Sequence, residues 1–485
     1  MSSLLVTAPI LGLIAMVMSL THLIPISVSL IYDDGSLSAF TFSMFLNLAC
    51  GYVIWILSRP YAREIMARDS ILLVVLAWSG GALFATVPLL LVLPGLSFTD
   101  AYFETMSGLT TTGSTVLTNL DYLPHSINIW RGLLQWLGGM GIIVLAVAIL
   151  PLLGVGGRQI YKAETPGPMK DTKLTPRIAE TAKGLWLVYF GLSLACLAAY
   201  RLAGMSWIDA LMHTFTTMST GGFSTHDASF GHFDSALLEF ICFVFMLIAA
   251  INFGTHFVAS RARSLGPYRR DPEVAWFLAV VLGSCVGIGG YLWIMGVYPD
   301  FPTALRHASF NAVSVATSTG YATQDFNLWP VFAPLWMMFL VSFASCSGST
   351  GGGIKMIRAV ILYKQVYREF TRLLHPTAAV SMKISGHPVE NRVVFAVLAF
   401  LFIYIVCIVS LTLVLTASGL DAVSAFSAVI ACLNNLGPGL NQVGPATTFE
   451  VLNDFQIWVL SAAMLVGRLE LFTVLIIFTP VFWRK

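Results

Sequence analysis

Thr110-Thr111-Thr112-Gly113 is the first of four short runs in which small or polar residues lead to a glycine between two long apolar stretches. The other three runs are Ser219-Thr220-Gly221-Gly222, Thr317-Ser318-Thr319-Gly320 and Asn434-Asn435-Leu436-Gly437. We call these the four glycine runs. Their final glycines are almost evenly spaced along the chain, which is typical of an internal structural repeat. The sequence therefore predicts four equivalent units, each built around one glycine.

The composition is that of an integral membrane protein. Hydrophobic residues make up 57% of the 485 residues and charged residues only 10%, whereas a soluble domain has about 25% charged residues. The net charge of +2 gives no reason to expect nucleic acid as a partner. The seven cysteines are scattered without metal-ligand spacing, so we interpret them as small buried residues. Because no Ser/His/Asp or metal constellation is assembled by spacing, we expect neither an enzyme nor an organic cofactor.

Ten apolar stretches are long enough to cross the roughly 30 Å of membrane hydrocarbon, which takes about 20 helical residues. They are predicted at 6–31, 38–58, 71–93, 128–153, 183–203, 235–260, 274–297, 331–362, 392–416 and 454–481. Alternate loops, at 59–70, 154–183, 261–273 and 355–392, hold most of the 26 lysine and arginine residues, together with Arg484 and Lys485. Basic loops face the cytoplasm. We therefore expect a multi-pass membrane protein with both termini in the cytoplasm.

Each of the last four pairs of spans encloses an outside segment that begins with a short apolar stretch, at 100–110, 207–218, 303–316 and 421–433. Ten helical residues reach about 15 Å, half of the hydrocarbon core, so these stretches are predicted as re-entrant half-helices. Their expected entry residues are Thr99-Asp100, Asp209, Thr303 and Asp421. The predicted fold is an all-α polytopic membrane protein with ten transmembrane helices. Its units are an N-terminal two-helix hairpin (1–66) and four span–half-helix–span repeats around one pore (67–160, 161–265, 266–375 and 376–485).

The four glycine runs are the candidate site. Non-helical backbone at membrane depth is tolerated only inside protein or beside a water-filled cavity, so we expect the runs to meet at a shared axis. Each half-helix points its partially negative C-terminal end at the membrane centre, which favours a cation there. Potassium filters are lined by four backbone loops whose carbonyl oxygens replace the water of the ion. The alternative, four ordinary loop glycines, is disfavoured because each run follows a half-helix.

We therefore predict a K+ selectivity filter made of all four glycine runs. Its residues are Thr110, Thr111, Thr112, Gly113, Ser219, Thr220, Gly221, Gly222, Thr317, Ser318, Thr319, Gly320, Asn434, Asn435, Leu436 and Gly437. K+ is expected at the backbone carbonyls of Thr111, Thr112, Thr220, Gly221, Ser318, Thr319, Asn435 and Leu436. No carboxylate lies in the runs, which argues against the acidic rings of some other cation pores.

A second unusual stretch interrupts the predicted span 331–362. It reads Ser345-Cys346-Ser347-Gly348-Ser349-Thr350-Gly351-Gly352-Gly353, and we call it the glycine-rich loop. Each glycine in a helix interior costs about 1 kcal/mol relative to alanine, so we expect the helix to break here. The broken segment would lie in the membrane below the filter. The alternative is a helix-packing patch of small residues, although so many consecutive helix breakers exceed what packing needs.

Arg468 lies near the middle of the last predicted span. A charge there costs about 2.5–3.5 kcal/mol on insertion scales, so the side chain should face protein or water. We expect it to face the cavity, to interact with the glycine-rich loop and to form a barrier to cations. An ordinary internal pair with Glu470 is the alternative, although residues two apart do not share a helix face.

With these motifs the chain resembles the Trk/Ktr/HKT superfamily of cation transport proteins and, within it, the TrkH family of bacterial potassium-uptake subunits. The resemblance covers essentially the whole chain, including the N-terminal hairpin. It implies M1–P–M2 repeats in a pseudo-fourfold array and a homodimer with a pore in each protomer. In this superfamily, glycine at all four filter positions accompanies potassium preference. The fourth run departs from the threonine-rich pattern, because it contains Asn434, Asn435 and Leu436.

The resemblance also implies a mechanism and partners. An intramembrane loop at the place of residues 345–353 is the proposed gate of the family, and the resemblance favours a gating role for Arg468. We expect K+ uptake across the bacterial inner membrane by gated, channel-like passive conduction, with K+ as the transported ion. A cytosolic ring of TrkA-like subunits that bind NAD or ATP is the implied regulator.

Two alternatives remain open at this point. A secondary transporter could couple K+ to H+ or Na+ by alternating access, since broken helices and repeats occur in that class too. Four repeats of the same sense favour a pore, whereas two inverted halves would favour alternating access. A receptor or scaffold that transports nothing is the weaker alternative.

Overall fold

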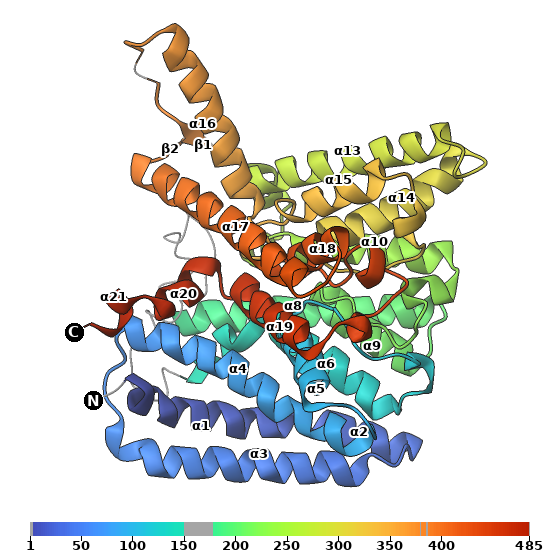
Figure 1. The fold of residues 1–485 in the computed structure, drawn as a ribbon, viewed down its shortest axis with the longest axis vertical. Helices are drawn as coiled ribbons and strands as arrows, with labels where there is room; N and C mark the ends of the chain where they lie inside the picture. The colour runs from blue at the N-terminus through green and yellow to red at the C-terminus, as the bar shows by residue number, and fades with distance from the viewer. Residues whose placement is uncertain (1–2, 150–177, 379, 385–386, 485) are drawn as a thin grey trace.

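The structure is a computed structural model that describes residues 3–149, 178–378, 380–384 and 387–484. It consists almost entirely of helices that run side by side (Figure 1). In the described residues, the one β element is an antiparallel pair of two-residue strands, β1 (Lys383–Ile384) and β2 (His387–Pro388). The prediction of an all-α polytopic fold is therefore confirmed.

The N-terminal hairpin lies at one edge of the molecule (Figure 1). Its first arm is α1 (Ser3–Thr21) followed by α2 (Leu23–Tyr32), and α3 (Leu37–Ser58) returns beside α1. Gly12 and Gly51 face each other across this pair. A Cβ added at Gly12 would lie 2.6 Å from the carbonyl oxygen of Gly51, and one added at Gly51 would lie 2.8 Å from that of Gly12. Small residues at this point let the two backbones approach closely, as in other membrane helix pairs.

The same sequence of elements then occurs four times. The first helices of the units are α4 (Ala67–Val92), α8 (Ile178–Leu202), α13 (Pro272–Ile294) and α17 (Asn391–Ala417). The half-helices are α5 (Phe98–Leu109), α9 (Trp207–Met218), α14 (Phe301–Ala316) and α18 (Ala422–Leu433). The returning segments are α6 (His125–Ile149), α10 (Ala236–Ala250) with α11 (Phe253–Ala262), α15 (Phe332–Val341) with α16 (Met356–Leu374), and α19 (Asp454–Arg468) with α20 (Leu471–Leu475).

Short helices fill the connections. The α-helical ones are α12 (Gly266–Arg270) and α21 (Pro480–Trp483). The 3-10 helices are η1 (Arg59–Tyr61), η2 (Leu120–Tyr122), η4 (Ser229–Phe233), η5 (Phe326–Leu328), η6 (Asn441–Val443), η7 (Phe449–Val451) and η8 (Ile476–Phe478).

All four half-helices begin within two residues of the predicted positions, but three of the four expected entry residues are wrong. The N-caps are Ser97, Ser206, Asp300 and Asp421. Ser97 and Ser206 each accept the backbone N–H of the aspartate three residues later, at 3.0 Å. That aspartate therefore lies in the first helical turn, where its charge is favourable to the helix dipole, and the serine before it is the cap.

Every returning segment is broken or kinked, although the sequence predicted a break only in the third. The axes of α10 and α11 differ by 94°, and α19 is bent by 116° against the segment that starts with α20. In α6 the break is a kink at Gly141, which has a φ of 65°. Between α15 and α16 the chain leaves the helix for residues 342–355. Four broken segments leave room for irregular backbone at membrane depth, which must then lie inside protein.

The breaks explain how the ten predicted spans correspond to the described helices. Among the described residues, six helices are long and apolar enough to cross a membrane, and the two bent pairs raise the number to eight. The remaining two spans correspond to α6, which ends where the undescribed residues 150–177 begin, and to α15, which has only 10 residues. Most of the basic tract predicted at 154–183 lies outside the described residues.

The helix α1 begins and α21 ends on the same side of the molecule (Figure 1). The helix α16 projects beyond the other helices at the top of the view in Figure 1, and β1 and β2 follow it in the chain. An even number of crossings brings the two ends of a chain to one side.

Candidate functional site

The four half-helices all end in the same type of backbone turn. In each, the second residue of the glycine run has a positive φ: 55° at Thr111, 52° at Thr220, 57° at Ser318 and 53° at Asn435. The N–H of this residue donates to the carbonyl three residues back, at 3.0–3.3 Å. The next N–H donates to the carbonyl five residues back, at 2.8–2.9 Å. This pair of bonds defines the Schellman motif, whose left-handed residue is most often glycine.

Here the left-handed position is occupied by threonine, serine or asparagine. Such a residue costs of order 1–3 kcal/mol and persists only where the surrounding structure enforces it. The glycine two residues later also has a positive φ, of 85° at Gly113, 73° at Gly222, 87° at Gly320 and 104° at Gly437. The alternation of two left-handed residues keeps the chain out of helix and strand through each glycine run.

The four glycine runs meet in a closed ring. A Cβ added at Gly113 would overlap the carbonyl oxygen of Gly221, one at Gly222 that of Thr319, and one at Gly320 that of Leu436. The ring closes between the fourth run and the first, where a Cβ added at Gly437 would lie 3.1 Å from the carbonyl oxygen of Thr112. Each glycine therefore touches the backbone of the next run, and a side chain at these positions would push the runs apart.

Most of the carbonyl oxygens predicted to bind K+ have no protein donor. In the described part of the chain, no N–H or O–H group donates to the carbonyls of Thr111, Thr112, Thr220, Ser318, Thr319, Asn435 or Leu436. The eighth carbonyl, that of Gly221, accepts a hydrogen bond from Nε2 of Gln135 at 2.7 Å. Buried carbonyls nearly always have a partner, so this ring suits a ligand that supplies positive charge or protons.

The ring separates two different spaces. On one side is a vestibule of about 400 Å³ that all four final glycines line. On the other side is the glycine-rich loop. A Cβ added at Gly352 would overlap the carbonyl oxygen of Asn434, and one added at Gly351 would lie 3.1 Å from that of Thr317. An ion on the axis would therefore have the open vestibule at one end and the loop at the other.

Side chains at the same place in three half-helices brace the chain after each glycine. Glu104 accepts the N–H of Val116 at 3.1 Å, His213 bonds to the hydroxyl of Ser224 at 3.0 Å, and Asn311 donates to that of Thr323 at 3.0 Å. Each bond ties a half-helix to the strand-like segment that leaves its glycine run. These three side chains therefore have a structural, anchoring role.

In the first unit, the bracing residue Glu104 also forms a buried ion pair. Nε of Arg131 donates to Oε1 of Glu104 at 2.8 Å, and both side chains are at most 1% exposed. The guanidinium also lies 4.4 Å from the centre of the Phe223 ring. Arg131 therefore links the first unit to the second, and Gln135, one helical turn later, bonds to the second glycine run. Neither residue was singled out from the sequence, although both are polar side chains within a predicted span.

The fourth glycine run is held by amides where the others use hydroxyls. In the first and third runs, the two outer threonine hydroxyls bond to each other at 2.7 and 2.8 Å. In the fourth, Asn434 accepts the phenol of Tyr404 at 2.8 Å, and Asn435 donates to the hydroxyl of Thr112 at 2.9 Å. The backbone turn is nevertheless the same, so the side-chain asymmetry does not extend to the backbone conformation.

The glycine-rich loop packs against three of the four glycine runs. The hydroxyls of Thr350 and Thr220 lie 3.1 Å apart, and the N–H of Gly352 donates to the Ser318 hydroxyl at 2.9 Å. The loop also closes on itself, since Ser345 donates to the carbonyl of Gly352 at 2.6 Å. A further contact joins it to the second unit, where Phe253 donates its N–H to the Gly348 carbonyl at 3.0 Å. Of the remaining residues of the loop, Cys346, Ser347 and Ser349 lie between these contacts in the chain, and Gly353 directly follows Gly352.

Two buried charged residues hold the ends of this loop. Oε1 of Glu273 accepts the N–H groups of Ser347 at 3.0 Å and of Ile357 at 2.9 Å, one near the start of the loop and one shortly after its end. Lys355 donates through Nζ to the carbonyl of Gly351. Both residues could have been noticed in the sequence. Glu273 directly precedes the predicted span 274–297, and Lys355 lies inside the predicted span 331–362.

The structure corrects the assignment of Lys355 to a cytoplasmic basic tract. Lys355 is buried in the protein, and so is Arg358, whose guanidinium lies 2.8 Å from Oε1 of Glu470 and 4.0 Å from the centre of the Phe400 ring. The basic tract that follows the loop therefore begins inside the protein. Its first two basic residues, Lys355 and Arg358, make contacts within the protein.

Arg468 connects the loop to the first unit. Its guanidinium donates to the carbonyl of Thr350 at 2.8 Å, to that of Gly139 at 3.1 Å and to that of Gly138. It lies at the end of α19, where the last segment breaks, and it lines a cavity of about 90 Å³ with the three consecutive glycines Gly351, Gly352 and Gly353. A fixed positive charge thus lies beside the loop, under the ring of carbonyls.

Comparison with known proteins agrees with this arrangement. The sequence matches the TrkH family of cation transport proteins over residues 36–485. The Trk system potassium uptake proteins TrkH of Halomonas elongata and of Escherichia coli K12 are each 47% identical to this chain over 98% of both lengths. The crystal structure of the potassium transporter TrkH from Vibrio parahaemolyticus matches with a TM-score of 0.89 and 44% identity, and covers 100% of both chains.

Proposed function

The chain belongs to the TrkH family of cation transport proteins, and from this premise we propose that it takes up K+ across a bacterial inner membrane by gated passive conduction. The observation that carries the proposal is the closed ring of four glycine runs, in which seven of eight candidate carbonyls accept no hydrogen bond from the residues that the structure describes. Oxygen dipoles of this kind can replace the hydration shell of K+. The relatives named as potassium uptake proteins support K+ as the transported ion.

In this proposal the glycine-rich loop is the gate and the present conformation is closed. The loop lies directly under three glycine runs, and the Arg468 guanidinium lies beside it. A cation that passed the ring would meet the loop backbone and a positive charge. Opening then requires the loop to leave Thr220, Ser318 and Asn434.

The proposal extends to topology and partners. The division into a hairpin (1–66) and units at 67–160, 161–265, 266–375 and 376–485 is part of it, as is the cytoplasmic location of both termini. Most of the basic residues lie in alternate loops, which supports that orientation. We also infer a homodimer and a cytosolic nucleotide-binding partner of the TrkA type. The helix α16 continues from the loop and projects from the molecule (Figure 1), so a partner that moved it could act on the gate.

Secondary transport with coupled H+ or Na+ is the competing function. The four glycine runs follow each other in one rotational sense, each glycine touching the next run. A ring of four like units suits a continuous pore, whereas alternating access is usually built from repeats that rock around one site.

The experiment that tests the proposal compares ion density along the ring axis. Structures of the chain in K+, in Rb+ as an electron-dense K+ substitute, and in Na+ should show density at the eight carbonyls with K+ and Rb+ but weaker or displaced density with Na+. Density elsewhere, or a ring that is empty with all three ions, would contradict the proposal. Growth of uptake-deficient cells at low K+ is the matching functional readout, and failure to restore it would favour a protein that does not transport.

A further inference from the structure

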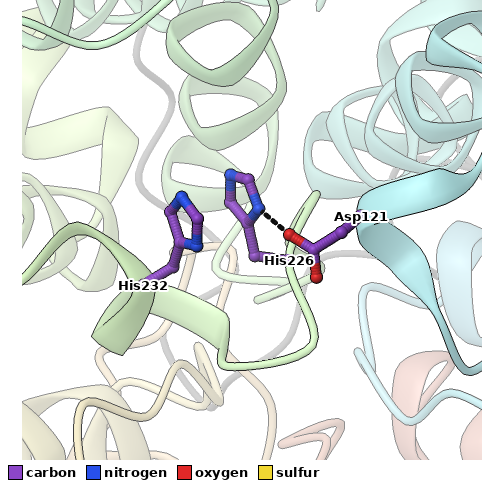
Figure 2. A group of neighbouring side chains, drawn as sticks. All are labelled: Asp121, His226 and His232. Carbon is purple, nitrogen blue, oxygen red and sulfur yellow. Dashed lines mark hydrogen bonds and ion pairs between the residues drawn. The ribbon is translucent and has the colours of Figure 1, made fainter.

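Three side chains with metal-binding atoms gather outside the ring of glycine runs. They are Asp121 in η2, His226 in the loop after the second glycine run, and His232 in η4 (Figure 2). Their ligand atoms all lie within 4.8 Å of one another. The cluster joins the first unit to the second, since Asp121 comes from one and both histidines from the other.

The two histidine rings are stacked in parallel, with their centres 3.4 Å apart. His226 uses Nδ1 to contact Oδ1 of Asp121, as Figure 2 shows. In the described residues, no hydrogen bond engages the ring nitrogens of His232, whose side chain is exposed. The solvent-exposed ring of His232, the ring of His226 and the carboxylate of Asp121 together offer a set of metal-binding atoms. The two stacked rings would have to tilt so that their in-plane lone pairs point at one ion.

The residues behind the cluster resemble the outer shell of a metal site. Nε2 of His226 faces Oδ1 of Asp209 at 3.3 Å, and Asp209 in turn accepts the hydroxyl of Thr225 at 2.7 Å. A carboxylate on the far nitrogen of an imidazole fixes its tautomer and orientation and is a common feature of histidines that bind metal. The other oxygen of Asp121 accepts the N–H of Asp227 at 3.2 Å, which leaves Oδ1 as the ligand atom.

The charge of the cluster also favours a cation. Asp121 lies at Nδ1 of His226, and Asp209 lies 3.3 Å from its Nε2. A divalent cation bound at His226 would therefore lie close to two carboxylates.

We propose that Asp121, His226 and His232 form a binding site for a late first-row divalent cation, with Zn²⁺ as the best fit, at the rim of the outer vestibule. Imidazole with carboxylate suits Zn²⁺, Ni²⁺ or Cu²⁺, whereas Mg²⁺ and Ca²⁺ prefer oxygen ligands alone. Two histidines and one aspartate leave a fourth tetrahedral position for water. The bound ion would join the loops of the first two units.

The site has a consequence for transport, and this part rests on the proposed function. His226 lines the same vestibule as the four final glycines, next to Asp227 and Asn119. A divalent cation held there would repel monovalent cations that approach the ring, because fixed charge in a confined space changes the local ion concentration. The expected effect is inhibition of K+ entry from outside.

Binding is tested without any transport assay. The full chain, purified without an affinity tag and stripped with chelator, is titrated with ZnCl₂ by calorimetry at about pH 7.5, where free imidazole is mostly neutral. One Zn²⁺ should bind per chain, and His226→Ala, His232→Ala and Asp121→Asn should each weaken binding about tenfold or more. His375→Ala is the matched control, because His375 is an exposed histidine elsewhere in the chain. Because His232 is exposed, its substitution carries the least risk to folding, and His232→Cys should restore binding with a different ligand.

Two results would overturn the site: no stoichiometric Zn²⁺ binding by the native chain, or binding that survives all three substitutions. A second measurement addresses inhibition. External Zn²⁺ should slow Rb+ uptake into proteoliposomes about twofold or more for the native chain, and His232→Ala should abolish this effect. Unchanged uptake despite bound Zn²⁺ would overturn the inhibition but not the site. Absence of uptake by the native chain with Zn²⁺ binding intact would instead count against the proposed function.

Discussion

Single glycines in the four runs differ in how much room surrounds them, and this difference can be measured. All four have a positive φ, so any side chain there would be strained. At Gly113, Gly222 and Gly320 a Cβ would also overlap a carbonyl oxygen of the next run, but at Gly437 it would lie 3.1 Å from one. Substitution of Gly437 therefore gives a control that shares the backbone strain and has less overlap.

Gly113→Ser should lower the preference for K+ over Na+ about tenfold or more, which corresponds to about 1.4 kcal/mol. The serine would displace the carbonyl of Gly221, and K+ is predicted to bind at that oxygen. Reversal potentials in mixed K+ and Na+ solutions give the ratio. Gly437→Ser should change it less. Equal ratios in the native chain and in Gly113→Ser would count against the filter assignment.

The buried pair of Glu104 and Arg131 predicts a stability effect. Glu104→Gln alone should lower the free energy of unfolding by about 3–5 kcal/mol, because it leaves Arg131 as a buried charge without its partner. The double variant Glu104→Gln with Arg131→Met should lose less than the sum of the two single variants. Unfolding in detergent measures these losses. The half-exposed pair of Arg372 and Glu369 is the control, and its removal should cost no more than about 1 kcal/mol. Additive losses at Glu104 and Arg131 would mean that the pair is not coupled.

Arg468 predicts a change in ion flux. Arg468→Ala should raise K+ flux in the absence of any partner, because it removes both a positive charge and the bonds to the carbonyls of Thr350 and Gly139. Arg468→Lys keeps the charge but cannot span the same carbonyls with a planar fork. A higher flux in Arg468→Ala alone would identify the charge as the barrier. A higher flux in both variants would instead identify the hydrogen bonds to the carbonyls as the feature that restricts flux. An unchanged flux in both variants would reduce Arg468 to a structural role.

At the residue scale, the sequence predicted the unusual backbone conformation of the four final glycines, but not the positive φ of the residues two positions before them. Positive φ at Gly113 follows from its residue type, because glycine is the usual choice for that region. Positive φ at Thr111 or Ser318 does not follow, because tertiary contacts enforce it against the preference of the residue. The bracing roles of Gln135 and Arg131 were also missed, since their partners lie far away in the sequence.

Among the elements, the glycine-rich loop is held at both ends by one carboxylate. Glu273 accepts N–H groups from Ser347 near the start of the loop and from Ile357 shortly after its end. The loop itself contacts glycine runs of three units. Any change that frees its ends should therefore weaken the obstruction without touching the ring.

Two changes to this element should raise flux. Shortening residues 346–353 removes the obstruction directly, and Glu273→Leu releases both ends of the loop. Glu273→Gln is the matched control, because its amide oxygen can still accept both N–H groups. Rb+ uptake into proteoliposomes measures the flux, with elution volume and melting temperature as checks on folding. Equal or lower flux in a correctly folded shortened chain would remove the gate role from the loop.

The elements themselves were predictable where length and apolar pattern decide them. The half-helices α5, α9, α14 and α18 start within two residues of the predicted positions. The breaks between α10 and α11 and after Arg468 were missed, because the residues there do not form a run of helix breakers. The kink in α6 was missed although Gly138, Gly139 and Gly141 are helix breakers at that point. The stretch 345–353, with four glycines, predicts a break from propensity.

For the whole molecule, the decisive feature is how the first and last units meet. The hydroxyl of Ser114 donates to the carbonyl of Gly437 at 2.8 Å, and the N–H of Phe449 donates to the carbonyl of Thr115 at 2.8 Å. These bonds join segments more than three hundred residues apart in the chain and close the ring that the glycine spacing predicts. The order of contacts around the ring follows the order of the units in the sequence, so all four have the same sense.

A closed ring of like units predicts discrete currents. In a planar bilayer, the shortened-loop variant should give single-channel events that each carry many ions, because its path is continuous from the vestibule through the ring. Obligatory alternating access moves only a few ions per conformational cycle and gives no resolvable unitary current. The reversal potential should follow the K+ gradient alone and should not shift with a pH gradient or with added Na+. A shift with pH, or flux without unitary events, would favour coupled transport and require the four units to move against each other in each cycle.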